Sequence, residues 1–400
     1  MCNRTDYCNM YSINNMDMKS DVLVIGAGIV GLAHALAFAQ RGKNVTVVDR
    51  DSRAVGASVR NFGMVWPIGQ PAGKLLNRAL ISRQIWADIA NETQIFNDSV
   101  GSICLAYEED ELALLQEFYE LHQNSGYKLE WVSPDNLKEY SKAAKSEGFL
   151  GGLFSATELI VDPREALAKI PQYLNDKYGV EFLWNRPIQK VESGKAWSAD
   201  FCFEAEHILV CTGADFEVLY PEVYSKNSIT KCKLQMMRTL PQSNDWRLGP
   251  AISGGLTLLH YQAFQECKSL LPLKERVQKQ MPDYVKYGIH VMASQNGLGE
   301  IIIGDSHEYA QTHDPFNREH INEKILSYFH KMVEPVEARI SEHWQGIYAK
   351  MTDGATEFVY HPEAGVTIVN GLGGAGMTLS FGLAEETVSE VLEQKEPIII

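Results

Sequence analysis

Three glycines near the start of the chain have the spacing of a dinucleotide-binding turn. Gly26, Gly28 and Gly31 follow an apolar run at 22–25 and precede a segment rich in small residues. Gly26 permits a tight turn, Gly28 lets a pyrophosphate approach the backbone, and Gly31 lets a helix pack closely on a strand. The pyrophosphate would lie at a helix N-terminus, where free N–H groups and the helix dipole favour negative charge.

An acidic residue at the end of the next expected strand supports the same chemistry. Asp49 lies about 20 residues beyond the glycines, where a carboxylate can accept both hydroxyl groups of an adenosine ribose. A carboxylate at this position disfavours NADP, which carries a 2′-phosphate there. A purely structural turn would explain the glycines but not the acid that follows them. Residues expected to bind the cofactor at this end also include Ile29, Val30 and Arg50.

A second glycine-rich segment lies near the other end of the chain. An expected strand at 366–369 leads into a glycine loop at 371–376, and an expected helix follows from Met377. A nicotinamide dinucleotide does not need this second loop, so FAD is the expected cofactor. The N–H groups at the helix start would face the flavin edge that becomes negative on reduction. The alternative is a plain glycine turn under a C-terminal helix. The expected contacts here are Gly373, Gly374, Gly376, Met377 and Thr378.

Composition argues against several classes of partner. The chain has 400 residues, 36 Lys and Arg against 51 Asp and Glu, and a formal net charge of −15. It has no basic cluster suited to nucleic acid, and no apolar stretch approaches the roughly 18 residues that span a membrane. Its seven cysteines are scattered and lack CxxC spacing, which indicates reduced thiols in a cytoplasmic protein and no metal site.

The hydrophobic pattern predicts an α/β fold, α+β overall, in which a Rossmann-type cofactor domain is joined to an antiparallel-sheet substrate domain. The cofactor domain is expected at 20–90, 150–214 and 336–395, the substrate domain at 91–149 and 215–335, and a flexible extension at 1–19. Met18 would also make an ordinary start for the chain. Helices are expected at 73–89, 112–122, 162–174 and 314–332, and strands at 180–184, 188–191, 201–203, 207–211, 256–264, 288–295 and 300–309.

These motifs, in this order, resemble the D-amino-acid oxidase superfamily of flavoproteins, and the resemblance spans 21–392. Beside the two glycine segments and Asp49-Arg50, the matching residues are Gly56-Ala57-Ser58, Val161-Asp162-Pro163 and Leu209-Val210-Cys211-Thr212-Gly213-Ala214. The resemblance implies a fold like that of glycine and sarcosine oxidases, with extended FAD and a substrate sheet above the flavin. It also implies oxidation of a C–N bond, in which a neutral amine gives hydride to flavin N5 and the imine is hydrolysed.

Four further segments resemble a narrower bacterial subgroup linked to aminophosphonate catabolism. They are the segments at 58–67, 259–264, 304–309 and 344–348. The substrate implied by this likeness is a small anionic amine related to 2-aminoethylphosphonate. The alternatives are oxidation of an N-methyl or D-amino acid, and a non-catalytic flavoprotein that transfers electrons to a partner. A nicotinamide dehydrogenase ranks third.

The chain also departs from the superfamily pattern at three functional positions. No arginine follows Gly346, where amino-acid oxidases often bind the substrate carboxylate, so a simple α-amino acid is disfavoured. No cysteine occurs in the same segment, where sarcosine oxidases attach flavin, so noncovalent FAD is expected. Ile302 takes the place of an oxygen-activating lysine. The electron acceptor is therefore left open between O₂ and another acceptor.

Candidate catalytic residues come from the same segments. Arg60 presents a forked guanidinium suited to a phosphonate or carboxylate, but could equally neutralise the FAD pyrophosphate or a surface acid. His307 follows an expected strand and is preferred to His260, which a packed core residue would explain as well. Tyr261 and Tyr348 could complete the pocket, with Lys350 beside them. Further residues expected to bind FAD are Ser58, Asn61, Ile188, Cys211, Thr212 and Gly213.

Overall fold

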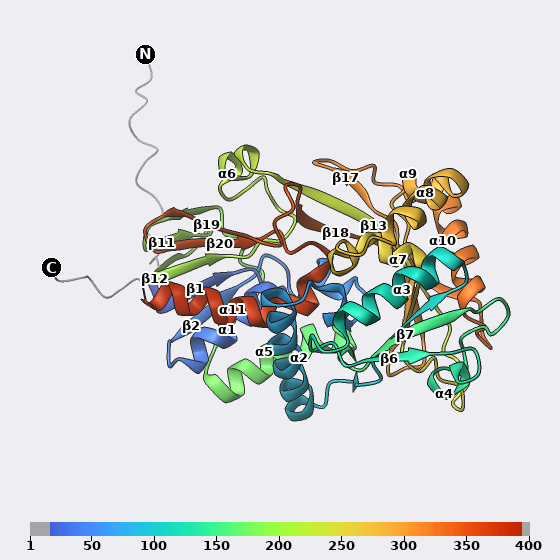
Figure 1. Ribbon diagram of the computed structural model, residues 1–400. Coiled ribbons are helices and arrows are strands. Elements are labelled where there is room, and N and C mark those ends of the chain that lie inside the picture. The colour runs from blue at the N-terminus through green and yellow to red at the C-terminus, as the bar shows by residue number, and fades with distance from the viewer. Residues whose placement is uncertain (1–16, 394–400) are drawn as a thin grey trace, which may run out of the picture.

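A computed structural model describes residues 17–393, which form two large sheets flanked by helices (Figure 1). The first sheet has eight strands. β1 lies at its centre and runs parallel to both of its neighbours, β12 and β2. Its strands are β1 (Asp17–Ile25), β2 (Val45–Val48), β9 (Glu181–Leu183), β10 (Lys190–Glu192), β11 (Lys195–Trp197), β12 (Cys202–Val210), β19 (Phe358–Glu363) and β20 (Val366–Asn370). β20 pairs with β12 in parallel, so the two ends of the chain share one sheet.

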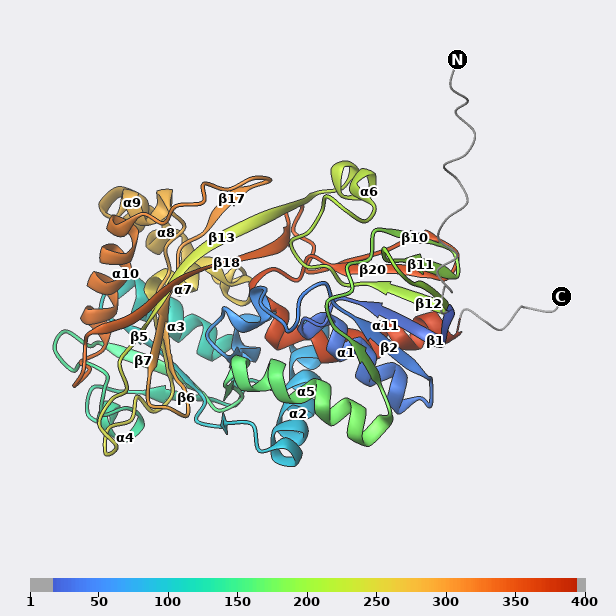
Figure 2. The same cartoon turned by 180° about the vertical axis from the view of Figure 1, so that it is seen from behind.

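Helices cover one face of this first sheet (Figure 2). They are α1 (Ile29–Gln40), α2 (Lys74–Thr93), α5 (Pro163–Tyr178) and α11 (Gly376–Glu393). Alternate residues of a strand point to opposite faces, and β1 therefore contributes to two cores. Val22 and Val24 pack with the helices, while Leu23 and Ile25 pack on the other side, under β19 and β20. The apolar run in the sequence is thus explained by burial on both faces.

The second sheet has nine strands and is mostly antiparallel. Its strands are β5 (Ser102–Ala106), β6 (Leu129–Val132), β7 (Gly151–Ser155), β13 (Ile229–Thr239), β14 (Ala251–Gly254), β15 (Met292–Gln295), β16 (Ile301–Gly304), β17 (Glu308–Ala310) and β18 (Ile340–Met351). The helices α3 (Glu109–His122), α7 (Gly255–His260), α8 (Leu270–Gln280) and α10 (Glu319–Met332) share its core. The smaller elements are β3 (Met64–Val65), β4 (Asn97–Asp98), β8 (Leu159–Val161), α4 (Leu137–Tyr140), α6 (Pro221–Lys226) and α9 (Pro282–Lys286).

The mixed architecture confirms the expected fold class, but several elements differ from expectation. The segment 256–264, expected as a strand, contains helix α7 and a short 3-10 helix, because a short apolar run can belong to a buried helix as well as to a strand. The helix expected from Asp314 starts at Glu319. The carbonyls of Asp314 and Phe316 instead accept hydrogen bonds from Lys233 Nζ, both at 2.8 Å. The two strands expected within 201–211 form the single strand β12.

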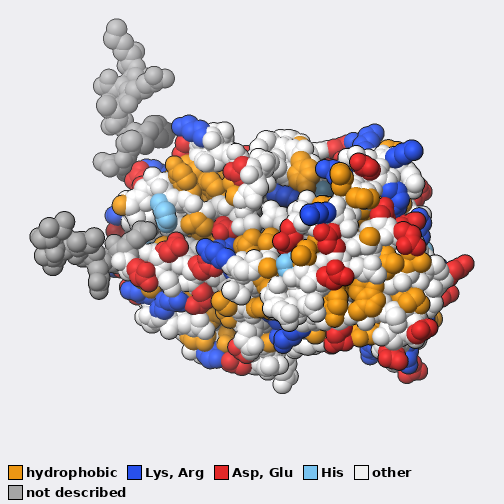
Figure 3. Space-filling model, viewed as in Figure 1, with side chains coloured by type: hydrophobic (Ala, Val, Ile, Leu, Met, Phe, Trp, Pro, Cys, Tyr) orange, Lys and Arg blue, Asp and Glu red, His pale blue; other side chains and the backbone are white. Residues whose placement is uncertain are grey.

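Sheet membership also bears on the proposed domain boundaries. β7 and β18 were assigned with the cofactor domain, but both pair with strands of the nine-stranded sheet. Their long-range partners are invisible to local periodicity. Residues 17–19, expected within the flexible extension, pair with Cys202–Glu204 as the first part of β1, and residues 1–16 lie outside the described part of the chain. On the face drawn in Figure 3, described acidic and basic side chains are interspersed. Within 17–393, no helix is both long and apolar enough to cross a membrane.

Candidate cofactor cavity and active site

The turn between β1 and α1 has room only for glycine at two positions. Gly26 has φ +108°, and a Cβ added there would lie 2.4 Å from the carbonyl oxygen of Cys211. A Cβ on Gly31 would lie 1.9 Å from the carbonyl oxygen of Gly26. At Gly28 the nearest atom to such a Cβ is Ser58 Oγ at 3.2 Å. The first and third glycines therefore bring backbones together, whereas the second keeps the cavity wall free of side-chain bulk.

Asp49 and Ser58 fix the shape of this turn through backbone hydrogen bonds. Asp49 Oδ2 accepts from the Ala27 N–H at 2.7 Å, and Asp49 Oδ1 accepts from the Asp51 N–H at 2.9 Å. Ser58 Oγ accepts from the Ile29 N–H at 3.0 Å. Both oxygens of the carboxylate thus accept from the backbone, so removing the carboxylate would disturb the turn as well as the expected ribose contact.

One cavity of about 1150 Å3 extends from this turn to the second glycine segment and beyond it. Its volume exceeds the roughly 300–1,000 Å3 usual for a single small ligand, so it can hold a dinucleotide and a small substrate together. The predicted residues that line it are Gly26, Gly28, Ile29, Val30, Asp49, Arg50, Ser58, Asn61, Ile188, Cys211, Thr212, Gly213, Gly373, Gly374, Gly376 and Met377, and the candidates Arg60, His260, Tyr261, His307 and Tyr348.

Three of the residues predicted to bind the cofactor have contacts in this structure that indicate a structural role beside the cavity. Gly31 is absent from the lining, as expected for a residue that packs a helix on a strand. Thr378 is also absent from the lining, and its Oγ1 accepts a hydrogen bond from the Trp66 N–H at 2.9 Å. Asn61 lines the cavity, but its amide nitrogen donates to the carbonyls of Ala57 and Ser58. We infer that Thr378 and Asn61 shape the wall.

The cavity walls fit an extended flavin dinucleotide. The Ser58 hydroxyl takes up the Ile29 N–H, but the first turn of α1 contains no acidic residue, so negative charge is favoured at this helix N-terminus. A Cβ on Gly374 would meet only the Tyr348 ring and hydroxyl, at 3.6 Å or more, and one on Gly376 only Ile29 at 3.8 Å. The second glycine segment therefore has space on its cavity side. Cys211 lines the cavity, where burial raises the pKa of its thiol to about 12 and keeps it protonated.

Three histidines meet at the far end of the cavity. His260 ends α7, His290 precedes β15, and His307 lies between β16 and β17. Their ring centroids are 4.0 Å apart for His260 and His290, 4.5 Å for His260 and His307, and 5.0 Å for His290 and His307. One donor atom from each lies within 4.8 Å of the others. We call these three residues the histidine cluster. No metal site was expected from sequence spacing, and His290 was not singled out.

A buried carboxyl group lies beside the histidine cluster. Asp305 Oδ1 is 3.3 Å from His290 Nε2, and Asp305 Oδ2 is 3.9 Å from His307 Nε2. Backbone hydrogen bonds between His290 and Asp305 extend the β15–β16 ladder and hold the two together. Nδ1 of His307 donates to the Gly288 carbonyl at 2.9 Å, so in the neutral ring Nε2 is a hydrogen-bond acceptor. Asp305 lies in a segment that the sequence did flag, at 304–309, but its role depends on this ladder.

Burial favours the uncharged forms of these groups. It lowers the pKa of His260 and His290 well below the usual value, and the charges of neighbouring histidines and of Lys350 add to the effect. Burial also lowers the pKa of His307 to about 4, with the Lys350 charge contributing. The pKa of Asp305 is raised well above its usual value for the same reason, burial. The imidazoles and the carboxyl group at the far end are thus polar groups whose uncharged forms are favoured.

Two tyrosines complete this polar end. Tyr348 lies on β18, and its buried hydroxyl has no hydrogen-bond partner among the described residues. Tyr261 follows α7, and its ring contacts those of Trp66 and His290. Burial raises the pKa of both phenols, so both remain hydroxyl donors. Lys350, two residues beyond Tyr348 on the same strand face, also lines the cavity.

A mixed sheet with a parallel centre, a second sheet and one cavity lined by two glycine segments are typical of a dinucleotide-dependent oxidoreductase. The model for the DAO family, described as FAD-dependent oxidoreductases, matches residues 21–390. The chain belongs to this family, and its cofactor is FAD.

Individual relatives are distant. The chain is 26% identical over 256 residues to D-amino acid dehydrogenase of Helicobacter pylori (strain ATCC 700392 / 26695), a match that covers 50% of this chain and spans only 61% of the relative. It is 22% identical over 399 residues to glycine oxidase of Geobacillus kaustophilus (strain HTA426), covering 95% of both chains.

Solved structures show the same fold. The crystal structure of glycine oxidase from Geobacillus kaustophilus matches with a TM-score of 0.75 and 18% identity, covering 95% of this chain and 96% of that one. L-proline dehydrogenase from P. horikoshii matches with a TM-score of 0.76 and 20% identity, covering 96% of each chain. At these identities the likeness concerns the fold alone.

Proposed function

We propose that this protein oxidises the C–N bond of a small anionic amine, preferably an aminophosphonate related to 2-aminoethylphosphonate. The observation that carries the proposal is the set of cationic side chains in the cavity. Of the five that line it, Arg60, Arg186 and Lys350 form no ion pair with a carboxylate within residues 17–393, whereas the other two pair with Asp215 and Glu217. Cations without a carboxylate partner in a cavity suit an anionic ligand. Oxidation of amines and amino acids by several relatives supports the same reaction class.

Bound FAD supplies the two-electron acceptor, and the side chains of the chain would position the amine and control its protons. The anionic group would be held by Arg60 or Lys350 together with His307. A neutral imidazole can accept a hydrogen bond from the amine, which must be neutral before it can give up hydride. Tyr261 and Tyr348 provide hydroxyl donors.

The proposal predicts a strong preference for anionic amines. Flavin reduction should be followed anaerobically in a stopped-flow instrument with 2-aminoethylphosphonate, its N-methyl derivative, β-alanine and propylamine. We expect the phosphonates to bind about tenfold to a hundredfold more tightly than propylamine, because each charge-assisted contact is worth about 1.5–3 kcal/mol. Equal affinities and rates for all four amines would contradict an anionic substrate.

Two rival functions make different predictions in the same experiment. An enzyme for an N-methyl or D-amino acid would reduce its flavin faster with sarcosine or a D-amino acid than with any phosphonate. A flavoprotein that only transfers electrons to a partner would not be bleached by any amine. The acceptor, O₂ or another, would be identified by reoxidation in air and with an artificial quinone.

Noncovalent attachment of FAD gives a separate prediction. Acid precipitation should release all the flavin into the supernatant, because no cysteine stands in 344–350 and the Cys211 thiol is held protonated. The absorbance of the supernatant and the colour of the washed pellet are the measurements. A yellow pellet would show a covalent bond.

The buried thiols Cys104, Cys232 and Cys267 also support the proposed cytoplasmic location.

A further inference from the structure

The far end of the cavity contains more buried polar atoms than its own contacts use. His290 Nδ1, Asp305 Oδ1 and the Tyr348 hydroxyl are all buried without a hydrogen-bond partner among the described residues. His290 and Asp305 are 4% exposed, so bulk water does not satisfy them either. Buried polar atoms without partners are costly, and several of them lining one cavity indicate a polar ligand.

The relative orientation of the three imidazole rings helps to distinguish a metal ion from a larger polar ligand. The ring planes are tilted by 34° between His260 and His290, by 41° between His260 and His307, and by 19° between His290 and His307. The lone pair of an imidazole nitrogen lies in its own ring plane. Of the three pairs, the rings of His290 and His307 stand nearly face to face and direct their lone pairs side by side, whereas a metal ion requires lone pairs that converge. This pair of rings therefore favours a ligand larger than a metal ion.

The charge balance indicates an anion. Lys350 reaches the cluster from β18, and its charge acts on all three imidazoles and on Asp305. The Lys350 ammonium also lies 3.4 Å from the Tyr309 hydroxyl. A phosphonate dianion beside this single ammonium would leave one negative charge uncompensated. Three neutral imidazoles within 5.0 Å of one another are the groups able to take up the missing positive charge.

We propose that the histidine cluster and Lys350 form a proton-coupled anion site, in which binding of a phosphonate dianion is accompanied by protonation of one imidazole. His290 is the expected proton carrier, because its free Nδ1 would become a donor to the anion while Nε2 remains beside Asp305. This inference rests on the proposed function for its ligand class. It adds the location of the anion and the uptake of a proton on binding.

The groups that face the histidine cluster come from several elements. They are Tyr261 after α7, Asp305 after β16, Tyr309 of β17, Cys232 of β13, and Tyr348 and Lys350 of β18, with Arg60 elsewhere in the same cavity. Burial raises the pKa of Asp305, Cys232 and the three phenols. The uncharged forms of these groups are therefore favoured.

Calorimetry on the FAD-loaded protein with ethylphosphonate tests the site without turnover, because this ligand has no amine. Binding is measured in two buffers with different heats of ionisation, at a pH above the second ionisation of the ligand. We expect the heats to differ by the uptake of a proton, and the uptake to be smaller for the monoanion ethanesulfonate. An imidazole whose pKa rises on binding favours binding below that raised pKa, so affinity should fall as the pH increases through it.

His290→Gln replaces the imidazole by an amide of similar size, which can still form hydrogen bonds but cannot take up the proton. We expect it to weaken ethylphosphonate binding about tenfold to a hundredfold and to abolish proton uptake, with an unchanged flavin spectrum. His330→Gln is the matched control, because His330 is a partly buried histidine on α10 outside the cavity. It should leave both affinity and proton uptake unchanged. If His290→Gln does not retain flavin, the pH dependence of wild-type affinity still decides the question.

Several results would overturn the anion site. They are absence of ethylphosphonate binding, equal heats in the two buffers, affinity independent of pH, and a stoichiometric transition metal that is lost in His290→Gln. Failure of the proposed function looks different, since ethylphosphonate would then bind with proton uptake although no amine reduced the flavin. Reduction by anionic amines without proton uptake would refute only the present inference.

Discussion

Gly31→Ala is expected to abolish stable FAD binding and to destabilise the protein by about 3 kcal/mol or more, the upper end of the cost of overpacking a core. The added methyl group would lie 1.9 Å from the Gly26 carbonyl oxygen and 3.1 Å from the Val24 side chain. The first contact is with backbone, which cannot rotate away as a flexible side chain can. The β1–α1 turn would therefore have to open at the position where the pyrophosphate is expected to bind.

Gly56→Ala is the matched control for this prediction. Gly56 lines the same cavity, has φ −81°, and a Cβ there would meet no atom within 4 Å. Its replacement should leave the stability nearly unchanged. The measurements are the ratio of flavin to protein absorbance after purification and the midpoint of urea unfolding. Full flavin occupancy in Gly31→Ala would show that the turn can relax and that the structural reason for this glycine is wrong.

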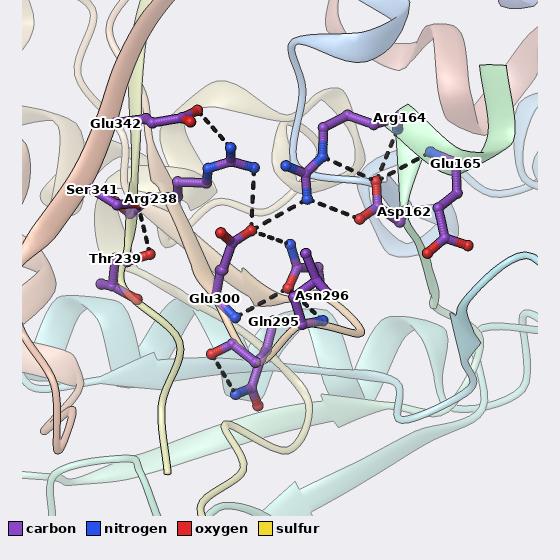
Figure 4. A network of polar contacts seen from close by, with 12 residues as sticks. Asp162, Arg164, Glu165, Arg238, Thr239, Gln295, Asn296, Glu300, Ser341 and Glu342 are labelled. Atoms are coloured by element: carbon purple, nitrogen blue, oxygen red, sulfur yellow. Dashed lines mark hydrogen bonds and ion pairs between the residues drawn. The ribbon is translucent and has the colours of Figure 1, made fainter. Parts of the chain in front are cut away.

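Glu300→Ala is expected to lower the free energy of unfolding by about 2–3 kcal/mol. Breaking a fully buried ion pair costs about 3–5 kcal/mol, and the loss is smaller here because this site is partly exposed. Glu300 Oε2 accepts from Arg164 at 3.2 Å, from Arg238 at 3.1 Å and from the Asn296 amide at 2.8 Å (Figure 4). Arg164 belongs to α5, which covers the first sheet, whereas Arg238 lies on β13 of the second. The network therefore joins the two halves of the molecule.

Glu342→Ala provides the comparison within the same network. The Glu342 side chain is 58% exposed and pairs with Arg238 alone, so its removal should cost no more than about 1 kcal/mol. Urea unfolding of Glu300→Ala and Glu342→Ala, monitored by both flavin release and far-UV circular dichroism, gives the two free energies. Similar values for the two variants would show that Glu300 does not carry the contact between the halves.

Local sequence was sufficient for the cofactor end of the cavity. The contacts of Gly31 and Asp49 are with neighbours within about two dozen residues, the Gly26 carbonyl and the Ala27 N–H, whereas the need for glycine at 26 also comes from the distant Cys211 carbonyl oxygen. The second glycine segment was predicted for the same reason, since a strand, a glycine loop and a helix follow one another directly. That the two segments line one cavity follows from the parallel pairing of β1, β12 and β20.

The sequence by itself therefore determined the cofactor and the class of fold, and it predicted the glycine segments expected to hold a dinucleotide, because turn chemistry and hydrophobic period are local properties. Only the tertiary structure decided the far end of the cavity. His260 lies on a helix that the apolar pattern could not distinguish from a strand, and His290 gave no signal at all. Both reach His307 because separate elements of the second sheet and α7 pack around one core. Such contacts between distant segments are set by three-dimensional packing, which residue spacing does not encode.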